Sequence, residues 1–67
     1  MDPAFREALQ GKSQDWALRA IAGYTMRQVC KTAEEREQAD QHGLARTLTR
    51  QEREAWTFGF RWVERTN

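Results

Sequence analysis

The chain has few of the residues that stabilise small proteins through disulfides or bound metal ions. It contains one cysteine, Cys30, so an internal disulfide is excluded. That cysteine and the single histidine, His42, are too few for the four nitrogen and sulfur ligands of a structural zinc site. A chain of this size buries only about 60% of the surface that its unfolded form exposes. We therefore expect one domain, residues 1–67, that gains stability from helix packing and from association with a partner.

An excess of charge of one sign is also missing. The 11 basic and 10 acidic side chains leave a net charge of +1, whereas nucleic-acid-binding domains usually carry a strong basic patch. The hydrophobic fraction of 39% and the charged fraction of 31% are typical of a globular protein. DNA or RNA binding is kept as the second hypothesis, through the arginines of residues 46–61. These are Arg46, Arg50, Arg53 and Arg61.

Long apolar runs and targeting signals are absent as well. No stretch approaches the roughly 18 apolar residues that a membrane-spanning helix needs. The first residues include Asp2 and lack the apolar segment of a secretory signal peptide. Because the single thiol is also typical of a reducing compartment, we expect a cytoplasmic protein with no membrane association.

No constellation of residues indicates catalysis. His42 follows a polar segment and has neither a nucleophile pattern nor an orienting acid beside it. Cys30 lies near an apolar stripe, which favours a structural thiol over a reactive one. Glu34 and Glu35 belong to a polar run that is typical of a solvated helix face. We therefore expect a protein that is not an enzyme and that holds no metal and no cofactor.

What the chain does have is a concentration of aromatic side chains near its C-terminal end. Four of its seven aromatic residues lie in residues 56–62, and each aromatic side chain buries about 150–250 Å² when it packs. A helical period places Trp56 and Phe60 in one stripe. It places Phe58 and Trp62 in a second stripe on roughly the opposite side. The segment is therefore expected to pack on two sides. One side contacts the rest of this chain, and the other contacts another molecule.

Residues 56–62 fit either a helix or a strand, and the residues before them favour the helix. Thr49 and Glu52 have the spacing of a capping box, in which each side chain accepts the backbone N–H of the other residue. We predict a last helix from about residue 50 to residue 65. The alternative is a strand, which would need residues 24–32 as its partner.

Two earlier helices are indicated by their start signals. Asp2 followed by Pro3 predicts a short helix that ends at Gly11. Ser13 predicts the start of a longer, central helix.

The central helix is apolar over more than one face, which favours a position in the middle of the fold. Its first stripe comprises Leu18, Ile21, Ala22, Met26, Val29 and Ala33. A second stripe, well rotated from the first, comprises Trp16, Ala20 and Tyr24. We expect Ile21 and Val29 of the first stripe to be buried.

The sequence becomes more polar after Thr32. Thr32 and Glu35 form another capping-box pattern, so either a new helix starts here or the central helix continues to about residue 41. His42 followed by Gly43 predicts a helix end. In the connector that follows, Leu44 and Leu48 are expected to be anchored in the core.

Together these patterns predict an all-α domain of three to four short helices in a small bundle, assembled as a homodimer. Its apolar stripes exceed what one small core needs, and no site chemistry accompanies them. We therefore expect a small intracellular regulator or inhibitor that binds a larger protein, of the kind found among bacterial and phage accessory factors. The expected partner-binding residues are Phe58, Arg61, Trp62 and Arg65.

Overall fold

The computed structural model describes residues 2–66, without the side chains of residues 65 and 66, and over this range it is a bundle of helices joined by short loops. The helices are α1 (Pro3–Ala8), α2 (Gln14–Val29), α3 (Ala33–Arg46), α4 (Arg50–Phe60) and α5 (Trp62–Thr66). The described residues contain no strand. The prediction of a small all-α bundle is therefore confirmed, and the alternative pair of strands is wrong.

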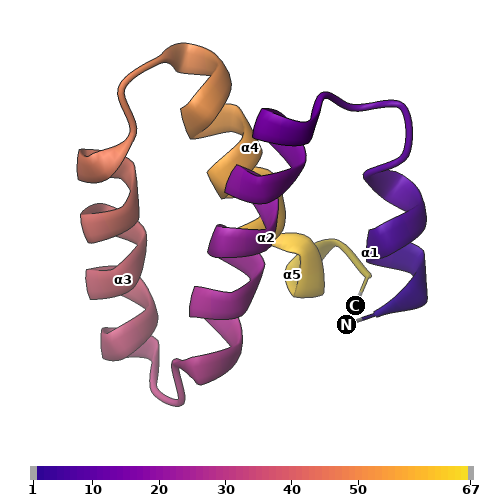
Figure 1. Ribbon diagram of the computed structural model, residues 1–67. Coiled ribbons are helices and arrows are strands. Elements are labelled where there is room, and N and C mark those ends of the chain that lie inside the picture. Colours follow the sequence, from indigo (N-terminus) through magenta and orange to yellow (C-terminus); the bar gives the residue numbers. More distant parts are fainter. Residues whose placement is uncertain (1, 67) are drawn as a thin grey trace.

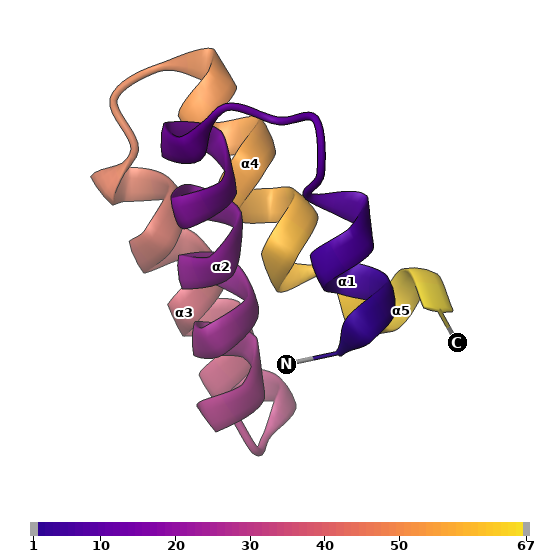
Figure 2. The ribbon, with the colours of Figure 1, turned by 45° about the vertical axis from the view of Figure 1, so that its right-hand side comes forward.

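Helices α2 and α4 form the centre of the fold. α3 runs antiparallel beside α2, and α4 crosses behind α2 (Figure 1). α1 and α5 lie on the other side of α2 from α3 (Figures 1 and 2). The extents of 33 × 28 × 15 Å describe a thin slab. In so thin a body, a central helix can be covered on one side and still have an outer face open to solvent.

Side-chain caps begin the first four helices, as the sequence predicts. In each cap a side-chain oxygen accepts the backbone N–H of a residue two or three positions later, at 2.9 to 3.2 Å. The cap residues are Asp2, Ser13, Thr32 and Thr49. A cap of this kind contributes about 1 kcal/mol to stability. The cap at Thr32 also shows that a new helix starts there, because α2 ends at Val29.

The contact between α2 and α4 is made backbone to backbone. Gly23 lies against the carbonyl of Trp56, and Gly59 lies against the carbonyl of Ala20. A Cβ atom at either glycine would overlap that carbonyl group. Ala20 and Ala55 are fully buried and extend the same contact. The two helices therefore cross at a separation that only small residues permit.

The larger of two aromatic clusters surrounds Phe5 on the α1 side of this crossing. Phe5 is fully buried and stacks on Tyr24, with 4.4 Å between ring centres. The rings of Phe58 and Trp62 lie 6.0 and 5.4 Å from the ring of Phe5. Trp16 joins the cluster through Phe58, at 5.3 Å. Phe5 thus attaches the six-residue helix α1 to α2, α4 and α5.

The smaller aromatic cluster faces α3. Trp56 and Phe60 are buried and stack with 4.7 Å between ring centres. The Trp56 indole lies directly on Gly43, where a Cβ atom would overlap the ring. Gly43 is therefore inside α3, which continues to Arg46, and the helix end predicted at His42 and Gly43 is wrong. The glycine permits a close approach of the indole and does not end the helix.

The face of α2 that enters the core is not the expected one. Ala20, Gly23 and Tyr24 are buried, whereas Val29 is 62% exposed. Ile21 is half-buried and packs at the edge of the core. The prediction that Val29 is buried is wrong, and Ile21 is only partly enclosed. The physical reason is size, because branched aliphatic side chains at the crossing would hold α2 and α4 apart.

The connector between α3 and α4 is held by a threonine. Thr47 is buried, and its hydroxyl donates a hydrogen bond to the Leu44 carbonyl at 2.8 Å. Leu44 is half-buried, but Leu48 is 86% exposed. The prediction that Leu48 is an anchor in the core is therefore wrong.

The predicted last helix is interrupted at Arg61. α4 ends at Phe60, and α5 starts at Trp62. The Trp62 indole N–H donates a hydrogen bond to the Asp2 carboxylate at 3.1 Å. This bond connects α5 to the cap of α1.

Candidate functional site

Two classes of site are not found in the part of the chain that the structure describes. Among residues 2–66, no group of three or more His, Cys, Asp and Glu side chains is placed to hold a metal ion. Within the same residues, every helix is too short or too polar to cross a lipid bilayer. The functional candidates are therefore surfaces formed by the helices.

The predicted partner-binding residues are divided between two sides of α4. Phe58 and Trp62 lie together, with 5.4 Å between their ring centres, and are half-buried in the cluster around Phe5. Arg61 points toward α3, where its guanidinium group lies 3.3 Å from the Asp40 carboxylate. The side chain of Arg65 lies outside the described residues. A role of these four residues in partner binding stays a prediction.

The largest exposed aliphatic side chains of the helices lie on the outer face of α2. Leu18 and Val29 are 57% and 62% exposed, and Met26 is 40% exposed. Ala22 and Thr25 between them are exposed too. Contiguous exposed apolar side chains mark interaction surfaces, whereas single ones are common on any protein. We call Leu18, Ala22, Thr25 and Val29 the α2 seam.

The spacing of the α2 seam is that of a helix-pairing surface. Its residues follow one another at intervals of four, three and four positions along α2. This is the alternation of a and d positions in a coiled coil. A stripe so narrow packs against one helix, whereas a helix that faces a broad core carries a wider apolar face. Tyr24 and the small residues that contact α4 lie on the opposite face of α2.

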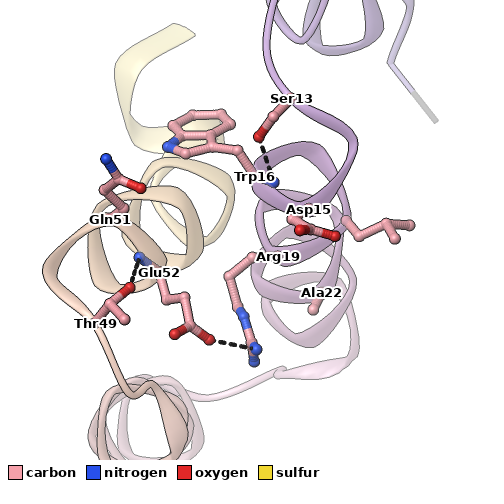
Figure 3. Close-up of a pocket in the computed structure, with 9 residues that line it drawn as sticks. Ser13, Asp15, Trp16, Arg19, Ala22, Thr49, Gln51 and Glu52 are labelled. Atoms are coloured by element: carbon pink, nitrogen blue, oxygen red, sulfur yellow. Dashed lines mark hydrogen bonds and ion pairs between the residues drawn. The ribbon is translucent and has the colours of Figure 1, made fainter.

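A shallow groove lies beside the α2 seam, between α2 and the start of α4 (Figure 3). Its volume is about 600 Å³, and its walls come from residues 13–22 and 49–52. Leu18 and Ala22 belong both to the seam and to the wall of the groove. The groove therefore extends the apolar seam toward a second helix.

An ion pair joins the two walls of the groove. Arg19 Nη2 and Glu52 Oε2 lie 2.7 Å apart (Figure 3), with side chains that are 36% and 26% exposed. On the α3 side of Arg19 there is a smaller hollow of about 160 Å³, lined in part by Ala22 and Met26. Arg19 and Ala22 line both hollows. The surface thus combines an apolar strip with paired charges beside it.

The pKa of the Asp2 carboxyl is lowered, and Asp2 lies away from this surface. The hydrogen bond from the Trp62 indole lowers the pKa of the Asp2 carboxyl, and the backbone N–H of Ala4 lowers it further. Both donors belong to the junction of α1 and α5. The shift therefore describes how the chain is held together and does not indicate proton-transfer chemistry.

Leu18, Ala22 and Val29 of the α2 seam belong to the first apolar stripe of the sequence, but the sequence does not show that they face outward. The signal that separates the two stripes of α2 is side-chain size. Ala20 and Gly23 are small enough for a close helix crossing, and Leu18 and Val29 are not. Phe5 of α1 then stacks on Tyr24, so the larger aliphatic residues Leu18 and Val29 are left outside.

Comparisons of the chain with protein-family models, with curated proteins and with solved structures found no match.

Proposed function

We propose that this chain is a small protein-binding regulator that recognises an amphipathic helix of a larger protein through the α2 seam and the groove beside it. The observation that carries the proposal is the exposure of Leu18 and Val29, at 57% and 62%, within a coiled-coil spacing. Helix-in-groove recognition places anchors of the partner at intervals of three and four residues. The α2 seam has the matching intervals.

The chemistry of the groove defines the partner helix that it fits. Apolar anchors of the partner would pack on Leu18 and Ala22, which are exposed on α2. Polar side chains beside those anchors would meet Arg19 and Glu52, which already lie at the rim as an ion pair. Burial of the apolar strip would supply most of the affinity, and the charges would select the orientation.

Regulation by occupancy needs no catalytic group. Because no catalytic constellation is seen in its sequence, the chain would act by covering a surface of its partner. We also propose a cytoplasmic setting, which is supported by the free thiol of Cys30, because such thiols persist in reducing compartments.

Nucleic-acid binding, the second hypothesis, has less support. Arg50 pairs with Glu54 at 3.3 Å, and Arg61 pairs with Asp40 at the same distance. These ion pairs offset the positive charge of two of the four arginines that the hypothesis needs. Binding of DNA or RNA that weakens steeply as salt is raised would favour it.

Site-specific photo-crosslinking in the source cells tests the proposed function. A photoreactive residue replaces Val29 in one chain and Gln38, which is exposed on α3, in the control chain. We expect one larger protein to be captured from position 29 and not from position 38. Adding Ala22→Lys to the Val29 probe should abolish that adduct, because it places a charge in the α2 seam. Equal capture from both positions, or none from position 29, would refute the proposal.

A further inference from the structure

We infer that, when its partner is absent, the α2 seam pairs antiparallel with the α2 seam of a second copy of this chain. The inference rests on the proposed function in one respect, that the seam binds a helix. Beyond the proposed function, the inference identifies the helix that covers the seam when no partner is bound. Two observations carry it, the order of side-chain sizes and the charges at the ends of the seam, and the extent of the surface sets the strength of the pairing.

The order of side-chain sizes along the α2 seam is self-complementary. It runs large, small, small, large over Leu18, Ala22, Thr25 and Val29. Two antiparallel copies related by a two-fold axis place Leu18 beside Val29 of the second copy, and Ala22 beside Thr25. In such an isologous contact each pair occurs twice. The small central residues let the helices approach, and the larger residues fill the space toward the ends.

The charges at the ends of the seam agree with the same arrangement. Asp15 is exposed in the first turn of α2, and Lys31 is exposed just after its last turn. Antiparallel pairing brings the end of α2 that carries Asp15 in each copy to the end that precedes Lys31 in the other copy. It also sets the two helix dipoles in opposite directions, which is favourable. A parallel pair would instead place Asp15 beside Asp15, with like charges together.

The extent of the surface sets the strength of the pairing. α2 has 16 residues, which is about 24 Å at the rise of a helix. One helix pair of this length buries less than the roughly 1,200 Å² of a stable interface, so the dimer is weak and reversible. Because partner binding uses the same side chains, the two complexes exclude each other. Self-association would then protect the seam until a partner competes for it.

Sedimentation equilibrium of the purified chain tests the pairing. The concentration series runs from about 10 μM to about 1 mM, since small interfaces are weak. The mass should rise from 7.9 kDa toward a dimer. Thr25→Lys should weaken the association by about tenfold or more, because it desolvates an ammonium group in each half of the interface. Lysine has the higher helix propensity, so the monomer should remain folded.

The matched control is Gln38→Lys. It adds the same charge at an exposed position of α3, outside the α2 seam, and the association should stay within about twofold of the parent, as expected for a screened surface charge. Circular dichroism of each variant verifies that the helices are intact.

A charge exchange tests the antiparallel orientation separately. Asp15→Lys alone and Lys31→Asp alone each place like charges together at both ends of the pair. Each should weaken the dimer severalfold, in line with the modest energies of exposed ion pairs. The double variant restores opposite charges and should recover most of the parental association. A double variant that is weaker than both single variants would overturn the antiparallel arrangement.

The outcomes separate this inference from the proposed function. The inference is supported if the dimer is lost in Thr25→Lys and kept in Gln38→Lys. It also requires that the double variant of Asp15 and Lys31 recovers the association that each single charge variant weakens. A dimer that survives Thr25→Lys uses another surface and overturns it. A mass of 7.9 kDa at every concentration also overturns it. In that case, capture of a larger protein from position 29 would still support the proposed function. If no larger protein were captured, the proposed function would be refuted together with this inference.

Discussion

At the scale of single residues, the glycines at the α2–α4 crossing determine how the helices fit. A glycine in a helix costs about 1 kcal/mol relative to alanine, so Gly23 and Gly59 each lower the intrinsic stability of their helix. What they permit is direct contact with the backbones of Ala20 and Trp56. The same contact excludes larger side chains from that face of α2. The exposure of the α2 seam therefore follows from two residues that have no side chain.

Gly59→Ala should destabilise the fold strongly. Its Cβ atom would overlap the Ala20 carbonyl, and a backbone atom cannot rotate away. We expect a loss of about 3 kcal/mol or more in the free energy of unfolding, at the upper end of overpacking costs. Gly11→Ala is the control, because no atom lies within 4 Å of its Cβ position and only its positive φ of 86° opposes alanine. That variant should lose about 1–2 kcal/mol. Equal losses in urea denaturation would contradict the close crossing.

Asp2→Asn should change how stability depends on pH. The Trp62 indole and the Ala4 N–H lower the pKa of Asp2 in the folded state. A carboxyl with a lowered pKa stabilises the fold above the ordinary aspartate value, about pH 4, and this contribution disappears as pH falls through the folded pKa. Asparagine caps helices about as well as aspartate, but its side chain has no carboxyl group to titrate.

Urea denaturation of the parent and Asp2→Asn between neutral and acidic pH measures this effect. The variant should be less stable at neutral pH, and the difference should narrow below about pH 4. A difference that stays constant with pH would show that the Asp2 charge does not matter.

At the scale of elements, helix starts were predictable because their signals are local. Asp2, Ser13, Thr32 and Thr49 each cap a helix by a hydrogen bond that spans only two or three residues. The end of α3 was not predictable in this way. Gly43 has the local signature of a stop, but the Trp56 indole, 13 positions later, needs the space that a side chain would occupy. A tertiary contact therefore outweighs the local signal.

The candidate site was predictable in composition and not in orientation. Three of the four α2 seam residues, Leu18, Ala22 and Val29, lie in an apolar stripe of the sequence, yet which stripe of α2 faces the core depends on how closely α4 approaches. The helical period of residues 56–62 predicts that one side of this segment is free for a partner. In the fold, Phe58 and Trp62 pack on Phe5, a residue more than 50 positions earlier. No local pattern in the sequence predicts that contact.

Leu18→Ala and Phe60→Ala should differ sharply in their effect on the monomer. Leu18 is 57% exposed, so its truncation should change the free energy of unfolding by less than about 1 kcal/mol. Phe60 is 4% exposed and stacks on Trp56, so its truncation should cost about 3–5 kcal/mol. Thermal melts in dilute solution, where self-association is negligible, measure both. A Leu18→Ala chain that loses 2 kcal/mol or more would mean that α2 is rotated from the orientation described.

At the scale of the whole molecule, the fold consists of two aromatic clusters on either side of one helix crossing. A slab 15 Å thick has little interior, so few side chains are fully enclosed. Phe5 is the only large one with almost no exposed surface among the described residues. It contacts rings from α2, α4 and α5, and so links elements that are distant in the sequence. The stability of the chain depends on that link more than on any local signal.

Phe5→Ala should therefore unfold the molecule and not merely release α1. Its expected cost of about 3–5 kcal/mol is comparable with the whole stability of a small domain. Phe5→Leu keeps most of the volume and should cost roughly 1–2 kcal/mol. Circular dichroism follows the helices, and tryptophan fluorescence follows the two clusters. The two signals should change together in the parent and in Phe5→Leu, because one cooperative unit contains both clusters. If Phe5→Ala instead kept a cooperative melt near that of the parent, the α2–α4 crossing with α3 would be stable alone, and α1 would be an accessory to it.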